Sequence, residues 1–133
     1  MKKLIVFLLF MPLSAIAASL PDDAGDYIRE VQNLVKTEQV VVRNGNGSET
    51  QSVGLLISSK EMFISSSELT EGGRRALEKS GRFAKQTNGR LTILMSDEQE
   101  HQNFHQRGYS LHGGEVKRNA FIGPYVYIVI AKK

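Results

Sequence analysis

Residues 70–95 read TEGGRRALEKSGRFAKQTNGRLTILM and place a helix, a stop signal and a strand in immediate succession. Thr70 has the side chain of a good N-cap, and the residues after it predict a helix over 71–87. The inward side of this helix is expected to comprise Ala76, Leu77, Ser80, Gly81, Phe83 and Ala84. The Asn88-Gly89 pair is a typical helix stop. Residues 90–95 then predict a strand, so a helix and a strand are expected to flank one short turn.

Two strands joined by a tight turn are predicted before this unit. Three consecutive valines in residues 39–43 favour a pleated backbone. Asn-Gly pairs accept the positive φ angles of a tight hairpin turn, and residues 44–47 contain two such pairs in succession. A second strand is expected at 52–57, and a further short strand at 62–65.

An amphipathic helix is predicted ahead of this hairpin. Residues 20–25 are polar and turn-like, and Asp22 or Asp23 is expected to cap the start of the helix. One apolar stripe at helical spacing follows, formed by Tyr27, Ile28, Val31, Leu34 and Val35. A stripe of this kind faces a core, so we expect the helix to lie on the sheet.

The C-terminal part adds a polar helix and a strand. Residues 97–107 predict the helix, and Gly108 is expected to end it. Residues 125–131 predict the strand, because they are rich in β-branched and aromatic residues. Side chains of this strand are expected to alternate between the two faces, Val126, Ile128 and Ile130 on one and Tyr125, Tyr127 and Val129 on the other. Because helices and strands interleave, we predict an α+β fold. This is a two-layer sandwich, in which two to three helices cover one face of a mixed sheet of four to five strands.

The N-terminal segment predicts export. Lys2-Lys3 is a basic start, residues 4–13 are an apolar run, and residues 15–17 offer small side chains for cleavage. This order is typical of a secretory signal peptide, here residues 1–17. The alternative is an uncleaved anchor, but the apolar run is much shorter than the roughly 20 residues of a membrane span. We therefore expect residues 18–133 to form a single periplasmic domain without a membrane span.

Composition narrows the class of function. The whole chain has a net charge of +3, and removal of Lys2 and Lys3 would lower it to +1. Nucleic-acid-binding surfaces are densely basic, so we expect no nucleic-acid partner. The sequence has no cysteine, which excludes disulfides, thiolate metal sites and thiol nucleophiles. We expect a domain held together by packing and hydrogen bonds, without a cofactor.

Two catalytic arrangements compete with simpler interpretations. His101 and His105 share a face of the predicted polar helix one turn after Glu98, a spacing compatible with a zinc site. A solvated helix face is the simpler interpretation, because a fixed metal needs further ligands. One of the serines at 65–67 could join Asp97 and a histidine in a hydrolytic triad, but no nucleophile-elbow motif marks any of them. We expect neither a metal site nor an enzyme.

The helix predicted at 71–87 carries a basic outer side. Steps of three to four residues bring Arg75, Lys79 and Arg82 together on its surface. This side is suited to an acidic polymer or an acidic surface of a partner protein. The alternative is the ordinary solvated face of an amphipathic helix.

The same region resembles the OmpA-like periplasmic domain family. The resemblance rests on Met62-Phe63-Ile64, on ELTEGGRRAL at 68–77, and on Asn88-Gly89 followed by the strand at 90–95. In that family a strand with a phenylalanine precedes a Leu-Thr-Pro-Glu-Gly-like helix start. The family binds peptidoglycan through an aspartate, which Asp97 matches, and an arginine on an Asn-x-x-Leu-Ser-x-x-Arg-Ala helix. This sequence lacks that helix, so the resemblance implies weak, salt-sensitive peptidoglycan binding or none.

A second resemblance is to the TrbC-type periplasmic proteins of F-like conjugative pilus assembly. Residues 63–67, FISSS, are similar to their Phe-Val-Ser-x-Ser stretch, and Pro124 precedes the final strand as in that family. Both resemblances imply an exported, non-enzymatic binding or assembly protein of the bacterial envelope with a protein partner. The leading hypothesis is a divergent OmpA-like role. The alternatives are an accessory of conjugative pilus or secretion-system assembly, and a metal-dependent hydrolase built on His101 and His105.

Overall fold

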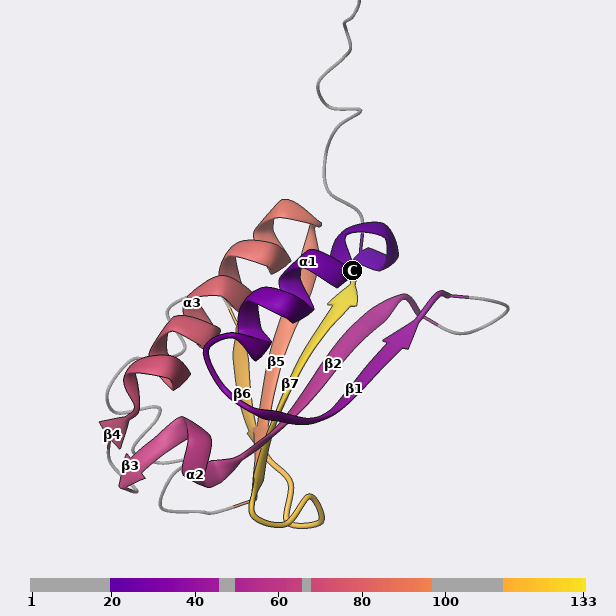
Figure 1. The fold of residues 1–133 in the computed structure, drawn as a ribbon. Coiled ribbons are helices and arrows are strands. Elements are labelled where there is room, and N and C mark those ends of the chain that lie inside the picture. Colours follow the sequence, from indigo (N-terminus) through magenta and orange to yellow (C-terminus); the bar gives the residue numbers. More distant parts are fainter. Residues whose placement is uncertain (1–19, 46–49, 66–67, 97–113) are drawn as a thin grey trace, which may run out of the picture.

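The computed structural model describes residues 20–45, 50–65, 68–96 and 114–133 (Figure 1). The predicted helix at 97–107, its stop at Gly108 and the predicted signal peptide lie outside these residues. The elements are α1 (Leu20–Gln32), β1 (Thr37–Arg43), β2 (Ser52–Ser58), α2 (Ser59–Met62), β3 (Phe63–Ser65), β4 (Glu68–Leu69), α3 (Glu71–Gln86), β5 (Gly89–Met95), β6 (Glu115–Arg118) and β7 (Tyr125–Lys132).

Five strands form the main sheet, in the spatial order β1-β2-β7-β5-β6. β7 lies between β2 and β5 and is antiparallel to both, β1 is antiparallel to β2, and β5 and β6 are parallel. The predicted antiparallel pair is confirmed by the β1–β2 pairing. Its connection is longer than the predicted tight turn, because Arg43 lies opposite Ser52 and residues 44–51 join the two strands; residues 46–49 lie outside the described residues. The α+β fold with a mixed sheet of five strands is therefore confirmed.

One face of the sheet lies under the helices. α1 and α3 pack side by side over it, α1 toward β2 and α3 toward β5 and β7 (Figure 1). The side chains of the central strands that point toward the helices are almost fully buried, namely Val53, Leu55, Ile57, Leu91, Ile93, Met95, Val126, Ile128 and Ile130. The predicted alternation along β7 is confirmed, because its buried residues are the even-numbered ones. The helices and this covered face form the hydrophobic core.

The start of the first helix corrects the prediction. Residues 20–25 are part of α1 and not a turn, so Asp22 and Asp23 lie within the described helix and not ahead of it. Leu20 and Ala24 are both buried in the core, and this packing holds the first turn in helical form. The apolar stripe also outlasts the helix, since Leu34 and Val35 lie in the turn after Gln32.

The second large helix forms as its sequence predicts. Thr70 is the N-cap, and its Oγ1 accepts a hydrogen bond of 2.9 Å from the Gly73 amide. All six residues expected on the inward side are buried. Asn88, just past the helix, has a φ of +54°, the left-handed conformation that ends many helices. The helix and strand predicted from residues 70–95 are thus confirmed as α3 and β5.

Two features between the hairpin and α3 differ from the prediction. Ser59–Met62 form the short helix α2, which the sequence pattern did not predict. The strand expected at 62–65 is confirmed only as β3, which pairs with β4 in a separate two-stranded sheet. Met62 and Phe63 are buried at this point, so the chain leaves the main sheet to bring both side chains into the core.

Candidate functional site

A buried aromatic pair joins α1 and α3. The rings of Tyr27 and Phe83 are stacked, with centroids 4.5 Å apart and planes 3° from parallel. The Ser80 hydroxyl donates to the Ala76 carbonyl oxygen at 2.8 Å, so the Tyr27 hydroxyl donates to Ser80 Oγ at 2.5 Å. Burial is the larger influence and raises the pKa of Tyr27 far above its usual 10, which keeps the phenol neutral. The pair therefore holds the two helices together through a satisfied, uncharged hydrogen bond.

A groove of about 320 Å³ lies above this pair, between α1 and α3. One wall is acidic and the other basic. Its lining residues are Asp23, Asp26, Tyr27 and Glu30 from α1, and Lys79, Arg82, Phe83 and Gln86 from α3. Lys79 Nζ lies 3.4 Å from Glu30 Oε1, so the two walls are joined by an ion pair. The groove is electrostatically mixed and not the basic surface that the sequence predicts.

The three predicted basic residues are only partly brought together. Lys79 and Arg82 line the groove, whereas Arg75 lies nearer the start of α3, where its Nε is 3.2 Å from Glu71 Oε2. Arg82 is exposed. Because Arg75 and Lys79 are both paired with carboxylates, their attraction for an acidic polymer is reduced, and salt screens what remains.

A second charge cluster at the start of α3 has the same effect. The Arg74 guanidinium lies 2.6 Å from Glu78 Oε2 and also bonds Glu71. The hydrogen bond from Arg74 is the main reason why the pKa of Glu71 is lowered, and the same bond raises the pKa of Arg74. All of these groups are exposed or half-exposed, so the cluster contributes little to stability. The outer side of α3 is therefore a network of opposite charges.

The remaining candidate residues lie mostly outside the described part of the chain. These are Asp97, Glu98, His101 and His105, and also Ser66 and Ser67 of the serine run. Ser65 is described and is exposed at the end of β3. Within the described residues there is no group of three or more histidine, aspartate and glutamate side chains placed to hold a metal ion. The expected absence of a zinc site and of a triad therefore stays a prediction, and so does the match of Asp97 to the aspartate of the peptidoglycan site.

The face of the main sheet opposite the helices forms a further surface, here called the open face. Cross-strand partners place Leu56, Tyr127 and Leu94 in one row across β2, β7 and β5, and Val129 and Val41 in the adjacent row. All five side chains are half-buried. No helix or strand of the described residues packs on this face, and charged Lys117 and Glu115 border it on β6. The open face is an apolar strip across four strands with a polar margin.

A glycine shapes the centre of the open face. The Tyr127 ring lies over Gly54 on the neighbouring strand, in the space where a side chain at position 54 would project. Gly54 is buried beneath the ring although no described helix lies over this face. The Gly54 backbone therefore supports the ring, and Tyr127 stays half-buried. An aromatic ring held in this way suits contact with an apolar partner surface.

The open face was not among the sequence-predicted sites. The alternation of Tyr125, Tyr127 and Val129 in the last strand is its signal in the sequence, together with Leu56 in the apolar run of β2. Such alternation indicates two different faces, but it does not tell whether the second face is covered. The order of strands, which brings Leu94 beside Tyr127, supplies the missing information.

In comparisons with known proteins, no family model matches the chain and no curated protein matches it. Among the described residues, no helix is both long enough and apolar enough to cross a membrane.

Proposed function

We propose that this protein is a non-enzymatic binding or assembly module of the bacterial cell envelope, divergent from OmpA-like domains, and that it contacts a protein partner through the open face. One observation carries the proposal, namely the half-buried apolar strip Val41, Leu56, Leu94, Tyr127 and Val129 on a sheet face without a described cover. Apolar patches with polar margins are characteristic of protein–protein contact sites. The resemblance of residues 62–95 to OmpA-like domains and the signal-like N-terminus support the location in the envelope.

The charges of α3 favour a protein over the cell-wall polymer as the main ligand. Arg75 and Lys79 are paired with Glu71 and Glu30, so the outer side of α3 presents both signs of charge. A polyanion needs an excess of cations, whereas a protein surface can match an alternating pattern. We therefore propose weak, salt-sensitive contact with peptidoglycan at most, and a protein as the specific partner.

Export is the first part of the proposal to test. Expression of the full chain in a Gram-negative host is expected to yield a soluble periplasmic protein that begins at Ala18, because residues 1–17 have the order of a cleaved signal. Intact-mass measurement of the periplasmic and membrane fractions reads the result directly. Recovery of the uncleaved chain in the inner membrane would contradict the proposed location.

The open face itself is tested by a charge substitution. Cross-linking in cells is expected to capture envelope proteins bound to the parent protein. Leu94→Glu is expected to abolish this capture, because it places a carboxylate in the middle of the apolar strip. The side chain is half-buried beside Lys117 on β6, which offers the new carboxylate an opposite charge and preserves the fold. The readout is the set of cross-linked partners identified by mass spectrometry.

A matched control separates the face from general apolar exposure. Ile64→Glu replaces a side chain that is 67% exposed on β3, outside the main sheet, and is expected to leave the cross-linked partners unchanged. Partner loss with Ile64→Glu, or partner retention with Leu94→Glu, would contradict a role for the open face. A pilus or secretion-system subunit among the partners would select the alternative assembly function.

A further inference from the structure

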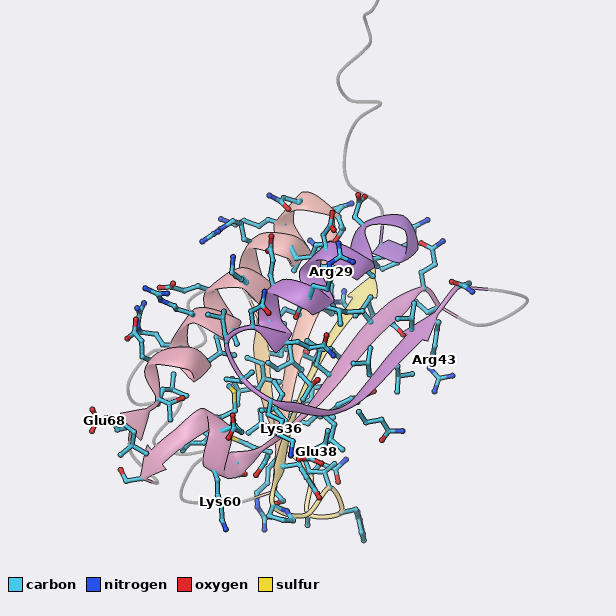
Figure 2. All side chains as sticks on the ribbon, viewed as in Figure 1. Arg29, Lys36, Glu38, Arg43, Lys60 and Glu68 are labelled. Atoms are coloured by element: carbon cyan, nitrogen blue, oxygen red, sulfur yellow. The ribbon has the colours of Figure 1, made fainter. Side chains whose placement is uncertain are left out.

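The outer edge of β1 is a second place where the sheet is incomplete. β1 is an end strand of the main sheet, and no described strand pairs with its outer side (Figure 1). Figure 2 labels Glu38 near its start and Arg43 at its end, and between these two residues lie Gln39 and three valines. Natural edge strands are usually protected by proline, by charged side chains or by a bulge. The segment 39–43 has no proline, its one charged side chain is Arg43 at its end, and the irregularity of β1 is confined to its start, between Thr37 and Gln39.

The regular part of β1 has a natural midpoint. Residues 39–43 pair without interruption with β2, from Gln39 opposite Leu56 to Arg43 opposite Ser52. The central residue of this segment is Val41. An antiparallel pair of two identical segments that uses all five residues must therefore place Val41 opposite Val41 of the second copy, on the two-fold axis. We infer that two copies of this chain associate through their β1 edges in this register, which joins their sheets into one.

The side chains of β1 complement themselves in this register. Val40 lies opposite Val42 of the second copy on the helix side, because both residues share that face with Leu55 and Val53. Val42 is 43% exposed in the single chain, and the pairing covers this side chain in both copies. On the open face, the amide of Gln39 lies opposite the guanidinium of Arg43 of the second copy. Directly opposed like charges destabilise a strand pair, and this register opposes none.

The other symmetric registers are less favourable. A pairing centred on Val40 would engage the irregular start of β1, where the strand does not present a continuous ladder of backbone groups. A pairing centred on Val42 would shorten the regular contact to three residues and leave Gln39 and Val40 unpaired. The self-complementarity about Val41 is the reason to assign the edge to a second copy and not to an unrelated strand.

A single introduced cysteine tests the register, because the natural sequence has none. Residues opposed in an antiparallel pair have Cα atoms roughly 4.5–5.5 Å apart, within the limit of about 7 Å for a disulfide. Val41→Cys is therefore expected to form a disulfide-linked dimer under mild oxidation of the purified full chain. In the matched control Arg43→Cys, each cysteine lies two residues from the axis, so the pair is separated by roughly 13 Å along the strands and does not bridge.

A second variant tests association without a new bond. Val42→Lys places two ammonium groups beside apolar Val40 partners, and the dissociation constant of the dimer measured by analytical ultracentrifugation is expected to rise by about tenfold or more. Asn33→Lys adds the same charge in the exposed turn after α1 and is expected to leave association unchanged. Val42 does not lie on the open face, so this result is independent of the proposed partner contact.

Selective disulfide bridging by Val41→Cys and weakened association by Val42→Lys would support the β1–β1 dimer. Bridging by Arg43→Cys at the same rate as Val41→Cys, or a sedimentation profile that Val42→Lys does not change, overturns it. Far-ultraviolet circular dichroism of each variant verifies that the fold is retained.

Discussion

Gly73→Ala is expected to destabilise the domain by about 3 kcal/mol, near the upper end of the usual cost of overpacking. Gly73 is buried at the start of α3, and an added Cβ would stand 2.6 Å from the Met62 carbonyl oxygen and 3.0 Å from Thr70 Oγ1. Hydrogen bonds hold the surrounding atoms in place. Thr70 Oγ1 accepts a hydrogen bond from the Gly73 amide and donates one to the Glu61 carbonyl oxygen at 2.7 Å, so a shift of Thr70 would break the cap that starts the helix.

The control for this prediction is a second helical glycine. Gly25 is exposed in the middle of α1, where the nearest atom to an added Cβ is Arg29 Nη1 at 3.8 Å. Gly25→Ala should stabilise the domain by about 0.5–1 kcal/mol, because alanine restricts the unfolded chain and favours the helix. Urea denaturation of both variants gives the two free energies of unfolding. An unchanged free energy of unfolding in Gly73→Ala would contradict the prediction, because the backbone between α2 and α3 could then shift to accommodate the added methyl group.

Alkaline unfolding is the second large effect expected. In the unfolded chain Tyr27 ionises near pH 10, while in the folded domain burial keeps its phenol protonated to much higher pH. The unfolded state thus releases a proton that the folded state retains, and the free energy of unfolding falls as pH rises above 10. The slope from this group is about 1.4 kcal/mol per pH unit, so two units remove about 2.7 kcal/mol.

Tyr27→Phe isolates that contribution. Loss of the hydrogen bond to Ser80 should cost about 1 kcal/mol at neutral pH, since the Ser80 hydroxyl retains its bond to Ala76. Above pH 10 the variant should lose stability less steeply than the parent protein, and the two curves should converge and then cross. Denaturation at fixed pH values between 8 and 12 measures both curves. Parallel curves would show that Tyr27 ionises without unfolding the domain.

Local signals in the sequence predicted those elements whose causes are local. The cap at Thr70, the buried side of α3 and the stop at Asn88 each depend on neighbouring residues, and all three are confirmed. The two Asn-Gly pairs likewise predicted an antiparallel pair that the β1–β2 register confirms, although residues 44–51 form a longer connection than a tight turn. Alternation in β7 predicted its two faces for the same reason.

Elements with distant causes were missed or misplaced. β6, with Val116 as its one buried residue, has no clear strand pattern and is held by parallel pairing with β5. Residues 20–25 are helical because Leu20 and Ala24 are buried in the core, which overrides the polar appearance of the segment. The open face depends on strand order, and periodicity contains no information on order. Of the candidate site residues, Lys79 and Arg82 were correctly placed on a shared surface, but their acidic neighbours on α1 are contributed by the tertiary fold.

The central position of β7 has a consequence for the timing of folding. β7 follows every other described strand in the sequence, yet it alone links β2 to β5. A chain synthesised from its N-terminus can form the β1–β2 hairpin and nascent helices early. In the described sheet, however, β2 and β5 are joined only through β7, so they stay separate until residues 125–132 have been synthesised. Pairing across such long sequence separations is also slow. For a chain exported as proposed, the five-stranded sheet therefore cannot close before its last strand has been made, so the complete fold is not available to oppose passage of the earlier segments.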